Sequence, residues 1–194
     1  MNVPQMRKKR RELSKSLARC SASEVLKAAH ELLGRGHLFV AYELVLHHPA
    51  ALASLDSKRL EALGRGIDSW GAVDCFGCYL AGPVWQARQI SDSLIHGWAR
   101  SPDRWWRRAA LVATVGLNCP ARGGRGDTRR TLRVCRMLAA DRDDMVVKAL
   151  SWALRELSKR DPTAVRRFLE QQPALAARVI REVRNKLTTG LKNP

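Results

Sequence analysis

The sequence has no run of the roughly 18 consecutive apolar residues that a membrane-spanning helix needs. Its start, MNVPQMRKKRREL, has no apolar segment of the kind found in secretory signals. Signals for β-strands are nearly absent too, because no sustained polar-apolar alternation occurs and no Asn-Gly or Asp-Gly turn joins β-branched runs. We therefore expect a helical, cytoplasmic protein, associated with the nucleoid if the cell is bacterial, with no membrane partner.

Patterns for metal and nucleophile sites are also missing. Cys75 and Cys78 form a C-x-x-C, but three other cysteines stand alone and no histidine lies at ligand spacing, so a four-ligand zinc site is not expected. No strand precedes the pair, which argues against a thioredoxin-like motif. The odd count of five cysteines favours reduced, buried thiols. The glycine-rich RGGRGD lacks the G-K-[ST] of a P-loop. We expect no metal and no cofactor.

Acidic residues are scarce relative to basic ones. Lys and Arg number 35 against 18 Asp and Glu, which gives a formal net charge of +17. Such an excess predicts a polyanionic partner. Nucleic acid is favoured over a membrane because arginine recurs along the whole chain instead of along one cationic amphipathic helix. We expect duplex DNA as the partner and a monomeric protein.

Helix punctuation is frequent. Ser21 with Glu24 makes a capping box, Asp56 precedes a periodic run, and both SPD (101–103) and DPT (161–163) place proline after a capping residue. These signals predict about ten helices of about 10 to 16 residues. Breaks are expected near 21, 35, 49, 66, 82, 101, 118–127, 141, 161 and 173.

Short joints between such helices predict an all-α fold of stacked antiparallel pairs, an α-solenoid of the HEAT or armadillo type. The 194 residues suit a single domain, 1–194. A concave surface of such a stack is where these architectures bind partners. The segment 118–130 is polar, glycine-rich and basic, and it predicts a mobile loop.

The helix predicted over 144–159 separates into two faces. Its apolar stripe comprises Val146, Leu150, Ala153 and Leu157. Its basic stripe comprises Lys148, Trp152, Arg155 and Lys159. A tryptophan within a basic stripe suggests a binding surface. The alternative is that Trp152 packs against the next helix of the stack.

A second informative helix begins near Ile67. Trp70 and Asp74 lie four residues apart and share a face, flanked by Gly71 and Gly77, which leave room for a backbone or a ligand to approach. Another side of the helix is apolar and comprises Ala72, Val73, Phe76 and Leu80. The alternative makes Asp74 a surface charge and Trp70 an exposed rim residue.

The third segment, 103–117, has a stripe of small residues with one tryptophan. That stripe comprises Trp106, Ala109, Ala110 and Ala113. Arg104 and Arg108 project from roughly the opposite side, where Arg108 could meet a phosphate. The alternative for Arg108 is a solvated arginine.

These segments resemble the alkylpurine DNA glycosylases of the AlkD type, which are HEAT-like repeat proteins. The matching pieces are SWGAVD, WWRRAAL and KALSWALRELSKRDPTAVRRFL, in the order typical of the family, and the resemblance covers most of the chain from about Pro4 to Arg184. Family members typically begin with about two further helices, and only NVP of the following turn is present here. The resemblance therefore leaves open a form that binds DNA but is inactive.

The resemblance implies roles for individual residues. Trp70 and Trp152 match two aromatic residues lining the lesion site, Asp74 a catalytic carboxylate, and Arg108 an arginine that contacts the DNA backbone. Arg155 falls on a further basic position beside the DNA. The helix faces described above add Lys148, Lys159 and Arg104 as predicted DNA contacts.

The activity expected from the resemblance is monofunctional hydrolysis of the N-glycosidic bond of cationic N3- or N7-alkylpurines, as a step of base excision repair. Two other readings stay open. One is a non-catalytic DNA-binding repeat protein of the same family, and the other is a protein-binding HEAT scaffold, which would have an apolar or mixed groove instead of a basic one.

Overall fold

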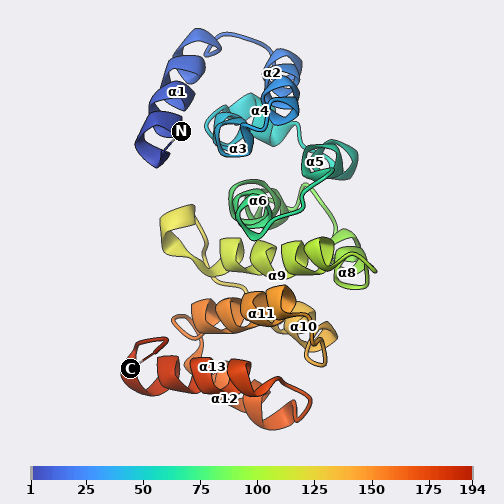
Figure 1. Ribbon diagram of the computed structural model, residues 1–194, viewed down its shortest axis with the longest axis vertical. Coiled ribbons are helices and arrows are strands. Elements are labelled where there is room, and N and C mark those ends of the chain that lie inside the picture. Colours follow the sequence, from blue (N-terminus) through green and yellow to red (C-terminus); the bar gives the residue numbers. More distant parts are fainter. Residues whose placement is uncertain (1, 194) are drawn as a thin grey trace.

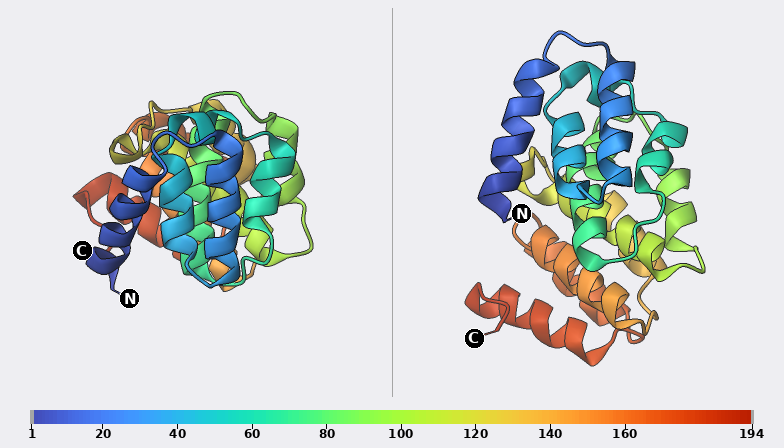
Figure 2. Two further views of the ribbon diagram at one scale, coloured as in Figure 1. Left: turned by 90° about the horizontal axis from the view of Figure 1, so that it is seen from above. Right: turned by 45° about the horizontal axis from the view of Figure 1, so that its top comes forward.

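The computed structural model describes residues 2–193, and this part of the chain is helical with no β-strand. Its helices stack in layers along the long axis of the molecule, and both termini lie on the same side of the stack (Figures 1 and 2). The all-α fold of packed helix pairs predicted from the sequence is therefore confirmed. None of the helices formed by residues 2–193 combines the length and apolar composition needed to cross a bilayer.

The amino-terminal layers contain five helices. Their bounds are α1 (Val3–Ser16), α2 (Ala22–Gly34), α3 (Leu38–Leu46), α4 (Pro49–Ala53) and α5 (Ser57–Gly64). Helix α1 buries none of its residues and rests beside α3, where Arg7 and Arg10 pair with the buried carboxylate of Glu43. The layer of α2 and α3 packs on the middle of the chain.

The middle of the chain forms one continuous helical run. It comprises α6 (Trp70–Phe76), a π-helical turn η1 (Gly77–Ala81) and α7 (Gly82–Gln86). The expected break near 82 is therefore wrong. Pro83 is the second residue after the π turn, and the wider turn before it relieves the clash between a proline ring and the carbonyl four residues earlier.

Two glycines of this run allow close packing against α9 (Arg104–Asn118). A Cβ on Gly82 would lie 2.8 Å from the Cα of Gly116, and a Cβ on Gly77 would lie 2.7 Å from a methyl carbon of Val112. The free energy that these glycines cost the helix is thus offset by close packing against α9, on the backbone of Gly116 and on the side chain of Val112. Gly71, by contrast, has no neighbour within 4 Å of its Cβ position, so it stands in open space beside Trp70.

The remaining helices form two rows. Their bounds are α8 (Asp92–Ala99), η2 (Pro120–Arg122, a 3₁₀ turn), α10 (Thr128–Met137), α11 (Asp144–Leu157), α12 (Pro162–Gln171) and α13 (Ala177–Thr189). We call α6, α9, α11 and α13 the first row, because each packs on the next, as Figure 1 shows. We call α8, α10 and α12 the second row, whose members pack behind α9 and α11.

Side-chain caps explain where several helices begin. Ser21 and Glu24 form the expected capping box, and Asp56 accepts a hydrogen bond at the start of α5. Asp161 caps α12 with Pro162 in the first turn, also as expected. In SPD, however, the cap of α9 is Asp103, so proline precedes the cap and does not follow it.

The segment 118–130 is held at several points. The side-chain amide of Asn118 donates to Thr131 Oγ1 at 2.8 Å, and Arg160 donates to the carbonyls of Asn118 and Gly124 at 3.0 and 2.8 Å. The side chain of Gln86 donates to the carbonyl of Gly123 at 2.9 Å. These contacts tie the segment to both neighbouring layers. The mobility expected for it stays a prediction.

Candidate functional site

The site is built around the first turn of α6. Ser69 caps this helix, so Trp70 is its first residue and Asp74 lies one turn further on the same face. The Trp70 side chain projects from the packed stack and the residue is 63% exposed. Asp74 is less accessible, with 19% of its side chain exposed. An exposed aromatic ring therefore stands beside a largely buried carboxylate.

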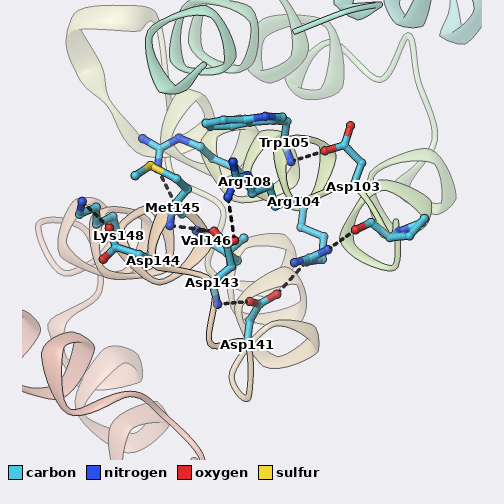
Figure 3. A network of polar contacts seen from close by, with 12 residues as sticks. Asp103, Arg104, Trp105, Arg108, Asp141, Asp143, Asp144, Met145, Val146 and Lys148 are labelled. Carbon is cyan, nitrogen blue, oxygen red and sulfur yellow. Dashed lines mark hydrogen bonds and ion pairs between the residues drawn. The ribbon is translucent and has the colours of Figure 1, made fainter. Parts of the chain in front are cut away.

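Arg108 of α9 holds the carboxylate of Asp74 in a two-point ion pair. Its Nε donates to one oxygen and its Nη2 to the other, both at 2.9 Å. Its Nη1 donates to the backbone carbonyl of Met145 at 2.5 Å. Figure 3 shows the Arg108 side chain reaching toward Met145. This one guanidinium thus joins α6, α9 and α11, and it fixes the plane of the carboxylate.

The interpretation of Arg108 as a solvated arginine is wrong, because the residue is only 5% exposed. Arginine suits this place since it stays charged even when buried. The alternative that Asp74 is a simple surface charge is also wrong, because only 19% of its side chain is exposed and Arg108 pairs with it. The other part of that alternative, an exposed Trp70, agrees with the structure. Burial raises the pKa of the Asp74 carboxyl, and Arg108 and Arg122 lower it and only partly offset that effect.

The other predicted aromatic residue, Trp152, is on α11, two layers from Trp70 along the first row. It is partly buried and packs against the hydrophobic core. The apolar stripe expected for its helix is confirmed, because Val146, Leu150, Ala153 and Leu157 are buried. Trp152 therefore combines core packing with a partly accessible ring. Its part in a lesion site stays a prediction.

Trp105 is a feature of the site that the sequence prediction missed. It lies three residues before Arg108 on the same side of α9, as Figure 3 shows, and it is partly buried. The guanidinium of Arg104 sits 5.0 Å from the centre of its ring. Its spacing between two arginines was the signal that could have singled it out. Its neighbour Trp106 turns into the core and contacts Phe76 and Trp98.

The cations predicted to contact DNA all have carboxylate partners within the protein. Lys148 lies 2.5 Å from Asp144, and Arg104 lies 3.5 Å from Asp143 (Figure 3). The other two pairs are Lys159 with Glu156 at 2.7 Å and Arg155 with Glu182 at 3.9 Å. Three of the four cations are also well exposed, whereas the side chain of Arg155 is 18% exposed. A phosphate would have to compete with these carboxylates.

The cysteines do not form a metal site in the part of the chain that the structure describes. Among residues 2–193, no three His, Cys, Asp or Glu side chains come together as a metal site would require. Burial raises the pKa of the Cys75 thiol to about 11 and that of Cys78 to about 12. Both therefore stay protonated at neutral pH, which argues against a redox function for this pair.

The described residues thus form an all-α protein of packed helix pairs, with a buried ion pair and an exposed tryptophan as a candidate site on α6 and α9. The chain matches the family model of the DNA alkylation repair enzyme over residues 1–187. It therefore belongs to the DNA alkylation repair enzyme family. A search of curated proteins found no significant match to the chain.

Proposed function

We propose that this protein is a monofunctional DNA glycosylase that hydrolyses the N-glycosidic bond of N3- or N7-alkylated purines in duplex DNA. Such a base already carries positive charge, so it departs without a strong general acid, and the difficulty lies in the cationic sugar formed as the bond breaks. An anion and aromatic faces are the groups that stabilise a developing cation.

The observation that carries the proposal is the fixed Asp74 carboxylate beside the exposed ring of Trp70. Arg108 holds the carboxylate in one orientation, so little rearrangement is needed when positive charge develops nearby. In this mechanism Asp74 stabilises the oxocarbenium ion and orients the attacking water. Trp70 and Trp152 contact the sugar and the charged base, each contributing about 0.5 to 2 kcal/mol.

The charge distribution supports DNA as the substrate. The net charge of +17 favours a polyanion, and Arg104, Lys148 and Lys159 keep about half of their side chains exposed while paired. Exposed ion pairs are weak, of the order of 0 to 1 kcal/mol. A phosphate oxygen can therefore replace the carboxylate at each cation. Arg108, by contrast, acts through Asp74 in this structure, and a direct phosphate contact by it is a further part of the proposal.

A second candidate function is non-catalytic DNA binding. One observation favours it: both oxygens of Asp74 already accept hydrogen bonds from Arg108, so part of the carboxylate charge is neutralised before any substrate arrives. The two candidates differ in whether base release depends on Asp74.

The test is single-turnover release of 7-methylguanine from methylated duplex DNA. We expect Asp74→Asn to slow release by roughly 100-fold or more while DNA affinity changes little. The matched control is Asp68→Asn, because Asp68 is an exposed carboxylate six residues earlier. Thermal unfolding shows whether each variant is folded. Normal release by folded Asp74→Asn would contradict the assigned role, and no release by the unaltered protein despite salt-sensitive binding would support the second candidate.

A further inference from the structure

A second cationic surface lies away from the Asp74 site, in a groove between α8 and α10 of the second row. The groove has a volume of about 330 Å³. Its lining comprises Asp92, His96, Arg129, Arg130, Arg133 and Arg136. Four guanidinium groups against one carboxylate leave three formal positive charges in one small depression.

The single carboxylate of the groove is already engaged by the arginine at its base. Asp92 lies 2.8 Å from Nε of Arg130 and also accepts a hydrogen bond at 2.8 Å from the indole of Trp85. Arg130 in addition stacks 5.2 Å from the centre of the Trp85 ring. These contacts fix Asp92 and Arg130 in place. They leave no carboxylate in the groove to neutralise the other arginines.

Arg129, Arg133 and Arg136 form an exposed stripe along α10. Within the described residues 2–193, none of the three forms an ion pair with a carboxylate. Arg136 instead rests 5.8 Å from the ring of Phe168 on α12. This contrasts with Arg104, whose charge is matched by Asp143. Arg129, Arg133 and Arg136 are therefore three neighbouring cations of the second row that no carboxylate neutralises in the described residues.

The pKa of His96 depends on the charges that surround it in the groove. Burial lowers the pKa of His96, and the nearby charges of Arg133 and Arg100 lower it further, against the opposing effect of Asp92. A bound anion would act in the opposite direction, because negative charge nearby favours the protonated imidazole.

We propose that the α8–α10 groove binds the phosphate backbone of duplex DNA as a second contact surface, separate from the segment held at Asp74. Arg129 and Arg136 are seven residues apart, which is about 10 Å of helix rise. Three base-pair steps at about 3.4 Å per strand cover the same length. Arginine also pairs with phosphate through two parallel hydrogen bonds. The proposal rests on the DNA binding proposed above, and it implies that the protein wraps or bridges DNA.

A membrane fits this groove less well than DNA. In the described part of the chain, the exposed large hydrophobic residues are Val3, Trp70 and Leu191, none of which is on α8 or α10. A cationic patch without an apolar side chain beside it has nothing to insert below lipid headgroups.

The experiment compares two double variants that each remove two positive charges. Arg129→Gln/Arg133→Gln alters the groove, and Arg35→Gln/Lys58→Gln alters two exposed cations elsewhere. Affinity for an unmodified 40-base-pair duplex is measured across salt concentrations. We expect the slope of log affinity against log salt to fall by about 2 units for the groove variant and to change little for the control.

A second measurement is NMR titration of His96 with and without saturating duplex. We expect DNA to raise its pKa in the unaltered protein and not in the groove variant. Equal slopes for the two double variants, or a His96 titration insensitive to DNA, would overturn the proposal. A third result would also overturn it. If the groove variant binds DNA as the unaltered protein does but has lost binding to polyglutamate, the groove is assigned to an acidic protein instead. Because these readouts need no base release, they are independent of the glycosylase test.

Discussion

Replacing Arg108 with methionine tests whether the buried ion pair organises the site. The substitution removes two hydrogen bonds to Asp74 and one to the carbonyl of Met145. Charged hydrogen bonds contribute about 1.5 to 3 kcal/mol each, and breaking a buried pair costs about 3 to 5 kcal/mol. Water can partly rehydrate Asp74, because 19% of its side chain is exposed. We therefore expect a loss of about 3 kcal/mol in the free energy of unfolding.

A double-mutant cycle separates the pair from its surroundings. Asp74→Asn keeps one oxygen that accepts from Arg108, so its expected cost is smaller, about 2 kcal/mol. Asp74→Asn/Arg108→Met leaves no unpaired charge. Its expected destabilisation is below the sum of the single effects by about 2 kcal/mol. Urea unfolding at neutral pH measures each value from the midpoint and the slope.

The pH dependence gives an independent check. Burial raises the pKa of Asp74, and Arg108 supplies most of the opposing effect, with a smaller part from Arg122. Without Arg108, the pKa of Asp74 in the folded state therefore rises further above its unfolded value. The folded state then binds a proton that the unfolded state has lost, and stability falls as pH rises through this range. The destabilisation by Arg108→Met should therefore shrink as pH falls from 7 toward about 4. A change below about 0.5 kcal/mol at pH 7, or a pH-independent change, would refute the importance of the pair.

Two further predictions compare matched positions. Gly82→Ala should destabilise the protein by about 1 to 3 kcal/mol, because its Cβ would lie 2.8 Å from the backbone of Gly116. Gly71→Ala has open space and should instead stabilise by up to about 1 kcal/mol; equal melting temperatures would contradict the packing described. Trp70→Ala should leave stability within about 0.5 kcal/mol but reduce base release, since Trp70 is 63% exposed. Trp85 is 0% exposed, so Trp85→Ala should lower the free energy of unfolding, measured by chemical denaturation, by about 3 to 5 kcal/mol. A larger loss for Trp70→Ala than for Trp85→Ala would refute the placement of Trp70 at the surface and Trp85 in the core.

Much of the fold could be predicted because its signals are local. Caps such as Ser21 and Asp161 and the apolar stripe through Leu150 depend on residues within a few turns of each other. The continuity of the helix through Gly82 could not be predicted in this way. It depends on the approach of Gly116, which lies on a different helix.

The candidate site was predicted in part for the same reason. Trp70 and Asp74 share a helix, so their spacing alone places them on one face. That Arg108 faces Asp74 follows from the packing of α9 on α6, across 34 residues of sequence. The pairing of Lys148 with Asp144 could have been predicted, because the two residues are four apart on one helix. The pairing of Arg104 with Asp143 could not, because it joins two layers that are brought together only by folding.

The sequence by itself determined the helical class, the excess of positive charge and the aromatic-carboxylate pair on α6, because periodicity, composition and short spacing are properties of the chain. Only the tertiary structure decided which cations are neutralised and which stay free. Burial and ion pairing depend on distances between helices, which place Arg108 in the core and leave Arg129 and Arg133 facing solvent.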